Sequence, residues 1–126
     1  MLEITVDEYL KVVKGKSKYG AKKTRCSHNQ LHDSKREATR CDELYVLKKA
    51  GVISGLKQQP RFVLQRAYEY EGKKIRALCY FADFAYWQDG VRVIEDCKGY
   101  RTGVYKIKKK LLLPILKRWG YHFVET

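Results

Sequence analysis

Residues 83–98 read DFAYWQDGVRVIEDCK, and this stretch decides the fold that we expect. Two runs of aromatic and β-branched residues flank Asp89-Gly90, a dipeptide that is typical of a two-residue hairpin turn. Residues that lie opposite each other across a hairpin share one face of the sheet. Counting outward from the turn therefore places Asp83 opposite Asp96, at the open end of the hairpin.

Two facing acids and a nearby lysine indicate chemistry on a phosphate. Like charges directly opposite each other destabilise a sheet, and the apolar neighbours Phe84 and Ile94 add a desolvation cost. Either one acid is neutralised, or a cation lies between them. A hard cation with oxygen ligands suits such a pair, with Mg²⁺ as the first choice and Mn²⁺ as a substitute. Alternation puts Lys98 on the face of Asp96, where it would polarise an attacking water.

A plainer interpretation stays open. Asp96 and Lys98 would then form an ordinary surface pair, with Asp83 at the edge of a strand. A register slip of one residue would also separate the two acids. We favour the catalytic interpretation because the hairpin register, a preceding helix and the net charge agree with it.

The remaining elements follow from caps and periodicity. Ser34 and Glu37 have the spacing of a capping box, Thr102 is suited to cap the second helix, and Gly51 and Gly120 are suited to end helices. Pro114 should kink or split the second helix, because proline lacks the amide donor. The expected elements are a helix at 34–50, strands at 61–65, 74–87 and 91–97, a helix at 103–119 and a strand at 121–124. This α-β-β-β-α-β order predicts an α/β (α+β) fold in one domain, 1–126, with a basic N-terminal arm at 1–32 and a core at 33–126.

Glu37 has two interpretations that do not exclude each other. The capping box alone explains a glutamate three residues after Ser34. Glu37 also shares a helical face with Cys41 and Leu44, which should pack on the sheet. It would then lie at the start of the helix and reach toward the two aspartates.

The composition describes a small basic domain. The chain has 126 residues, and its 27 Lys and Arg against 14 Asp and Glu give a net charge of +13. Such a charge favours polyanions, and nucleic acid first. No apolar run approaches the ~18 residues of a membrane span, and Glu3 argues against a signal peptide. We therefore expect a soluble protein of the cytoplasm that has no contact with membranes.

The four cysteines are Cys26, Cys41, Cys79 and Cys97, and none is part of a CxxC pair. Reduced, packed thiols are the simplest interpretation. A zinc site can be drawn from Cys26, His28, His32 and Cys41, although that spacing matches no finger template.

Asp83, the run Asp96-Cys97-Lys98 and Glu37 together resemble the PD-(D/E)XK nuclease superfamily, and the expected element order is the same as that of its restriction-endonuclease-like core. The resemblance covers residues from Ser34 to the C-terminus. The chain is also similar to small bacteriophage proteins that are regarded as relatives of Holliday-junction resolvases. One departure is Ala82, which stands where the superfamily motif often has proline.

The resemblance implies a function and a set of roles. Asp83 and Asp96 would ligate one or two Mg²⁺ ions with help from the backbone carbonyl of Cys97, Lys98 would assist the water, and Glu37 would complete the acidic cluster. The implied activity is that of a metal-dependent DNA endonuclease, selective for branched or junction DNA in phage recombination, replication or processing. A homodimer is expected, because cutting both strands of a junction needs two sites.

Basic residues beside the acids would bind DNA phosphates. The candidates are Lys22, Lys23, Arg25, Lys35, Arg36, Arg101, Thr102, Lys106 and Lys109. No base-reading helix is evident, which favours recognition of backbone and shape. The alternative function is that of a non-catalytic basic DNA-binding or assembly protein with a nuclease-like fold.

Overall fold

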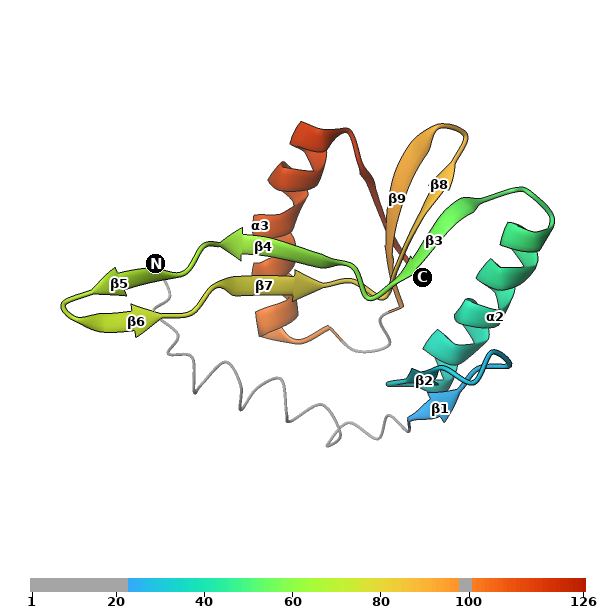
Figure 1. The fold of residues 1–126 in the computed structure, drawn as a ribbon, viewed down its shortest axis with the longest axis horizontal. Coiled ribbons are helices and arrows are strands. Elements are labelled where there is room, and N and C mark those ends of the chain that lie inside the picture. Colours follow the sequence, from blue (N-terminus) through green and yellow to red (C-terminus); the bar gives the residue numbers. More distant parts are fainter. Residues whose placement is uncertain (1–22, 98–100) are drawn as a thin grey trace.

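The computed structural model describes residues 23–97 and 101–126, and within them a mixed four-stranded sheet lies between two helices (Figure 1). The strand order is β10-β9-β8-β3, with β9 and β10 parallel and the other neighbours antiparallel. The elements in chain order are α2 (Lys35–Lys49), β3 (Ser54–Gln58), β8 (Phe84–Gln88), β9 (Val91–Asp96), α3 (Gly103–Trp119) and β10 (His122–Glu125). The predicted α+β fold is therefore confirmed, and the strands of this sheet and the two helices follow one another in the order α-β-β-β-α-β.

The central hairpin has the predicted register. Phe84 pairs with Glu95, and the ladder continues without a shift to Gln88 opposite Val91. The turn residues Asp89 and Gly90 have φ angles of 51° and 78°, the left-handed conformations that a tight turn of this kind requires.

Two further pairs of strands form a ribbon that projects from the sheet (Figure 1). They are β4 (Arg61–Gln65) with β7 (Leu78–Phe81), and β5 (Tyr68–Tyr70) with β6 (Lys73–Ile75). Two predictions are wrong here. The first strand of the sheet is β3 and not residues 61–65, and the expected strand at 74–87 is interrupted at Arg76-Ala77 and again at Ala82-Asp83. The second break arises because β7 pairs with β4, whereas β8 pairs with β3 and β9.

Both main helices begin and end where their caps predict. The Ser34 hydroxyl accepts a hydrogen bond from the Glu37 amide at 3.1 Å, and Thr102 caps α3 in the same way. Gly120 ends α3 with a φ of 72°. Pro114 does not split the helix, because the turn that lacks its amide lies on an exposed side of α3, where water can satisfy the free carbonyl.

The two faces of the sheet bury separate apolar clusters. Phe84 and Val93 pack with α2, whereas Ala85 and Ile94 pack with Leu112 and its neighbours on α3. This alternation is the period-two pattern of a sheet that is covered on both sides. Within the described residues, no helix has the length and apolar character to cross a membrane.

The ordered fold begins earlier than predicted. Part of the expected arm at 1–32 is a short hairpin, β1 (Thr24–Arg25) and β2 (Leu31–His32), which packs on α2. Cys26 and His32 are 6% and 3% exposed, and burying these two side chains against the helix explains why the segment is not a free arm. The rest of the predicted arm, up to Lys22, lies outside the described residues.

Candidate functional site

The open end of the β8–β9 hairpin holds two aspartates through crossed hydrogen bonds. The Asp83 amide donates to the Glu95 carbonyl at 3.1 Å and to Asp96 Oδ1 at 3.2 Å. In return, the Cys97 amide donates to Asp83 Oδ2 at 2.7 Å. Each carboxylate thus accepts a hydrogen bond from the backbone of the opposite strand. The two acids lie at the same end of the hairpin, as the register predicts.

The two acids differ in exposure. Asp96 is 0% exposed and follows Ile94 in alternation, which places it on the face that α3 covers. Burial, together with the charge of Asp96, raises the pKa of Tyr105 on α3 above its usual range. Asp83 is only half-buried, so solvent and a ligand can approach the pair from its side.

Glu37 approaches this end of the sheet from the other layer. It is buried in the first turn of α2, and its Oε1 accepts a hydrogen bond from Nδ1 of His32 at 3.0 Å. Burial and the charge of Asp83 both raise the pKa of Glu37, so the two carboxyl groups interact electrostatically. Glu37 therefore does more than cap its helix, although its hydrogen bond goes to His32.

The predicted metal ligands do not all meet at one point. Within the described residues, the oxygens of Glu37, Asp83 and Asp96 do not form a group whose members all lie within 4.8 Å of one another. Cys97 uses its amide to hold Asp83, and its thiol lies 3.2 Å from Thr126 Oγ1. Burial raises the pKa of that thiol to about 11, so it stays protonated at neutral pH. The predicted catalytic Lys98 lies outside the described residues.

The donor chemistry of the pair fits a hard cation. Asp83 and Asp96 offer carboxylate oxygens, the ligands that Mg²⁺ and Mn²⁺ prefer in proteins. Their backbone hydrogen bonds fix both carboxylates, as outer-shell donors do for metal ligands. Asp83 and Asp96 are therefore the residues of this site that could hold a divalent cation, and the charge of Asp83 also acts on Glu37.

A buried ion pair that the sequence did not reveal lies next to the acids. Glu95 is 0% exposed and accepts hydrogen bonds from Arg40 Nε at 2.6 Å and Nη2 at 3.0 Å. The Tyr86 hydroxyl donates a third at 2.8 Å. Arg40 is on α2, so the pair joins the helix to β9 one residue before Asp96. As the alternation predicts, Glu95 points to the face opposite to that of Asp96.

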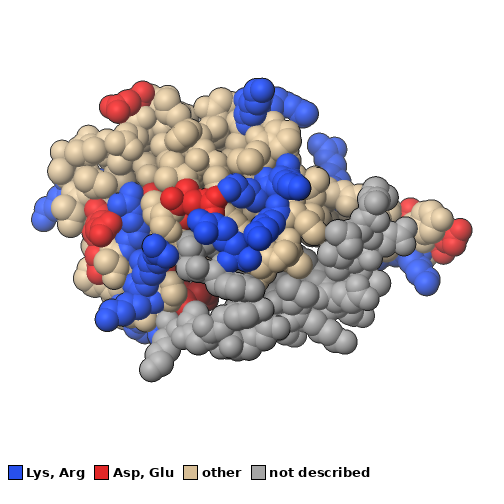
Figure 2. Space-filling view, turned by 180° about the vertical axis from the view of Figure 1, so that it is seen from behind, with Lys and Arg blue, Asp and Glu red and all other residues tan. Residues whose placement is uncertain are grey.

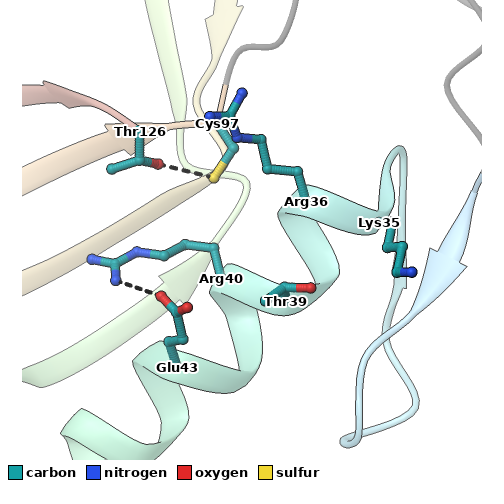
Figure 3. Close-up of a pocket in the computed structure, with 7 residues that line it drawn as sticks. All are labelled: Lys35, Arg36, Thr39, Arg40, Glu43, Cys97 and Thr126. Carbon is teal, nitrogen blue, oxygen red and sulfur yellow. Dashed lines mark hydrogen bonds and ion pairs between the residues drawn. The ribbon is translucent and has the colours of Figure 1, made fainter.

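A basic pocket opens beside this ion pair. Its volume is about 470 Å³, and its lining residues are Lys35, Arg36, Thr39, Arg40, Glu43, Cys97 and Thr126. In Figure 3, the Arg36 side chain extends from α2 toward Cys97, whereas Lys35 points away from it. The Thr126 amide donates to the Asp96 carbonyl at 2.8 Å, so the pocket adjoins the strand that carries that acid. Two predicted DNA contacts, Lys35 and Arg36, thus line this pocket, and Arg36 extends toward the residue that follows Asp96.

Three other predicted DNA contacts have structural roles near α3. Arg101 Nε lies 2.7 Å from Glu125 Oε2, and Lys109 pairs with the other oxygen of that carboxylate. Hydrogen bonds from Lys109 and then Arg101 lower the pKa of Glu125 to about 2. Thr102 uses its hydroxyl to cap the helix at Tyr105.

The other predicted contacts are surface residues. Lys23 and Lys106 are exposed, as is Arg25, which donates to the Asn29 carbonyl at 3.0 Å. Lys22 lies outside the described residues. Figure 2 shows Lys and Arg side chains gathered around a small acidic group near the middle of one face. That grouping of charge suits a phosphate-bearing ligand better than a neutral one.

Comparison with known proteins adds a family and no further relative. No curated protein matches the chain, and no solved structure matches it. Residues 16–121 match the family model described as "Protein of unknown function (DUF1064)". That range includes the aspartate pair, Glu37 and every residue that lines the basic pocket except Thr126. Because the match extends over most of the sequence, the chain belongs to the DUF1064 family.

Proposed function

We propose that the protein is a Mg²⁺-dependent DNA endonuclease that hydrolyses phosphodiester bonds at the open end of the β8–β9 hairpin. The observation that supports this most is the pair of crossed hydrogen bonds that fix Asp83 and Asp96 side by side. Two facing carboxylates repel each other unless a cation lies between them, and the net charge of +13 separately favours a polyanionic substrate. A divalent cation bound there would supply an acidified water and neutralise charge on the phosphate.

Each residue of the site would have a separate role in the reaction. Asp83 and Asp96 hold the cation, and the backbone amides of the hairpin keep their carboxylates oriented. Glu37 adds negative charge next to Asp83 and is itself oriented by His32. By the superfamily resemblance, Lys98 would orient the attacking water. Lys35 and Arg36 would hold the phosphates on either side of the scissile bond.

The substrate class is inferred from the helices as well as from the aspartate pair. No helix of the described residues presents a base-reading surface, because α2 and α3 both pack on the sheet. We therefore propose that the protein recognises the backbone and shape of branched or junction DNA. It would act in phage DNA recombination, replication or processing. A homodimer in the host cytoplasm would provide the two sites that a four-way junction requires.

A substrate panel tests this function. Labelled linear, single-stranded, flap and four-way DNA are incubated with the protein in Mg²⁺, in Mn²⁺ and in EDTA. We expect metal-dependent cleavage with preference for a branched substrate, and a loss of roughly two orders of magnitude or more in Asp83→Asn and in Lys98→Ala.

Asp89→Asn is the matched control. It removes one carboxylate from the same hairpin at its other end, where the residue is exposed in the turn and asparagine tolerates the positive φ. Cleavage should be unchanged in this variant. Activity that persists in Asp83→Asn would overturn the assignment of catalysis to this site. Tight, metal-independent binding without cleavage on any substrate would instead support the non-catalytic DNA-binding protein.

A further inference from the structure

Three buried side chains from different elements meet outside the aspartate site. Cys26 follows β1, His32 is in β2, and Cys41 is on the inner face of α2. Their exposed fractions are 6%, 3% and 0%. One ligand atom from each of them lies within 4.8 Å of the other two. Two sulfurs and an imidazole nitrogen in this arrangement are a donor set for a transition metal.

The distance between the two sulfurs fits one particular ion. Cys26 Sγ and Cys41 Sγ are 3.6 Å apart, far longer than a disulfide bond, and both cysteines are free thiols. Two thiolates bound tetrahedrally to one zinc ion, at about 2.3 Å each, lie about 3.8 Å apart. The spacing is therefore close to that of two zinc ligands.

His32 is oriented as a metal ligand would be. Its Nδ1 donates to the Glu37 carboxylate at 3.0 Å, which leaves Nε2 with a free electron pair. Nε2 is buried and has no hydrogen-bond partner in the described part of the chain. A ligating histidine that donates its other ring N–H to a carboxylate is the usual outer-shell arrangement at zinc. Glu37 thus has a second role, separate from its charge on Asp83.

We propose that Cys26, Cys41 and His32 bind a structural Zn²⁺ ion. Oε1 of Gln30 lies 3.4 Å from Cys41 Sγ and 3.9 Å from Cys26 Sγ, distances that suit a fourth ligand on the same ion. His28, which the sequence grouped with these residues, is outside this buried group. Its exposed ring stacks on the half-buried Tyr45 with the centroids 3.7 Å apart, and it groups instead with Asp42 and Cys26.

The ion would fasten the β1–β2 hairpin to α2. Each of these strands has two residues, too few to be stable without a further constraint. Zinc binding supplies such a constraint, because its free energy becomes folding free energy. It also locks the tautomer of His32, and so keeps Glu37 pointed to the end of the sheet.

Metal content tests the proposal on the full chain. The protein is expressed in zinc-supplemented medium and purified with a reductant and without chelator, and its zinc is measured by mass spectrometry. We expect about one zinc ion per chain, and roughly tenfold less or lower in Cys26→Ser. Cys79→Ala is the matched control, because Cys79 is also buried but lies in β7, away from the cluster, and it should keep its zinc. Glu37→Gln should weaken zinc affinity by about 10- to 100-fold.

A second experiment, cysteine alkylation, uses the protein without any substitution, so that no variant has to fold. Alkylation of cysteines is mapped before and after zinc is removed by a strong chelator. Cys26 and Cys41 should become reactive on chelation, whereas the reactivity of Cys97 should not change. Absence of zinc, equal zinc in Cys26→Ser and the parent, or a Cys26–Cys41 disulfide in reductant would each overturn the proposal. Because neither readout involves DNA, this result is independent of the proposed nuclease activity.

Discussion

Replacement of Arg40 by methionine tests how the acidic end of the sheet is held together. The Glu95 carboxylate is completely buried and receives two hydrogen bonds from Arg40, one from Tyr86 and a longer one from the Thr126 hydroxyl at 3.3 Å. Methionine keeps much of the side-chain volume of arginine but removes the charge and both donors. Arg40→Met therefore leaves a buried carboxylate with much of its compensation lost.

The expected loss in the free energy of unfolding follows from this geometry. Removing one partner of a buried ion pair costs about 3–5 kcal/mol, and the 25% exposure of the Arg40 side chain, which lets water reach the carboxylate, reduces this to about 3 kcal/mol. The second pair of Arg40, with Glu43, is exposed and adds at most about 0.5 kcal/mol. For a domain of this size we expect a fall in Tm of roughly 10 °C.

The assay is urea unfolding followed by circular dichroism, with thermal melts in parallel. Glu43→Gln is the control, because it removes only the exposed pair and should cost about 0.5 kcal/mol or less. The double variant Arg40→Met/Glu95→Gln should be more stable than Arg40→Met by about 1–2 kcal/mol, because the unpaired charge is gone. If Arg40→Met costs no more than Glu43→Gln, or if the double variant shows no recovery, the buried pair does not hold α2 to β9.

Three other predictions concern charge and the second helix. The folded-state pKa of Glu125, about 2, lies below the unfolded value of about 4.3, so its pairing stabilises the folded state above that value and this contribution is lost as the pH falls from about 5 to 2. The shift alone corresponds to about 3 kcal/mol, and solvent screening at the exposed partner Arg101 reduces this to about 1 kcal/mol. Glu125→Gln should therefore flatten the acid limb of stability measured by urea unfolding, and an unchanged limb would contradict the pairing with Lys109. The double change Lys35→Gln/Arg36→Gln should weaken DNA binding. The slope of log Kd against log salt concentration should fall by the amount that corresponds to about two phosphate contacts. An unchanged slope would show that the DNA binds elsewhere on the protein. Pro114→Ala should raise the free energy of unfolding by about 1 kcal/mol, because it restores an amide donor within α3, and a loss of stability would contradict an unbroken helix.

The central hairpin and the two helices could be predicted from local features of the sequence. The Asp89-Gly90 turn and the alternation on either side of it determine the register, and the register places Asp83 beside Asp96. Helix limits were predicted to within a residue or two, because Ser34 and Thr102 supply caps whose partners lie three residues away. Each of these features depends on contacts between near neighbours in the chain.

The first strand of the sheet could not be predicted in this way. Gly55 of β3 has a φ of 59°, and a Cβ atom there would lie 2.9 Å from Trp87 Cδ1. The strand is irregular near this glycine, so it shows neither the alternation nor the β-branched composition of a strand. Residues 61–65 have that composition but pair outside the four-stranded sheet.

The sequence by itself determined the hairpin, its register and the two acids at its end, because these depend on spacing along the chain. Only the tertiary structure decided which side chains meet across layers. Glu95 finds Arg40 on α2, and Glu37 turns to His32 beside two cysteine thiols. The physical reason is that such partners are selected by burial. A carboxylate without water needs a donor from whichever element packs against it, and neither periodicity nor spacing encodes that packing.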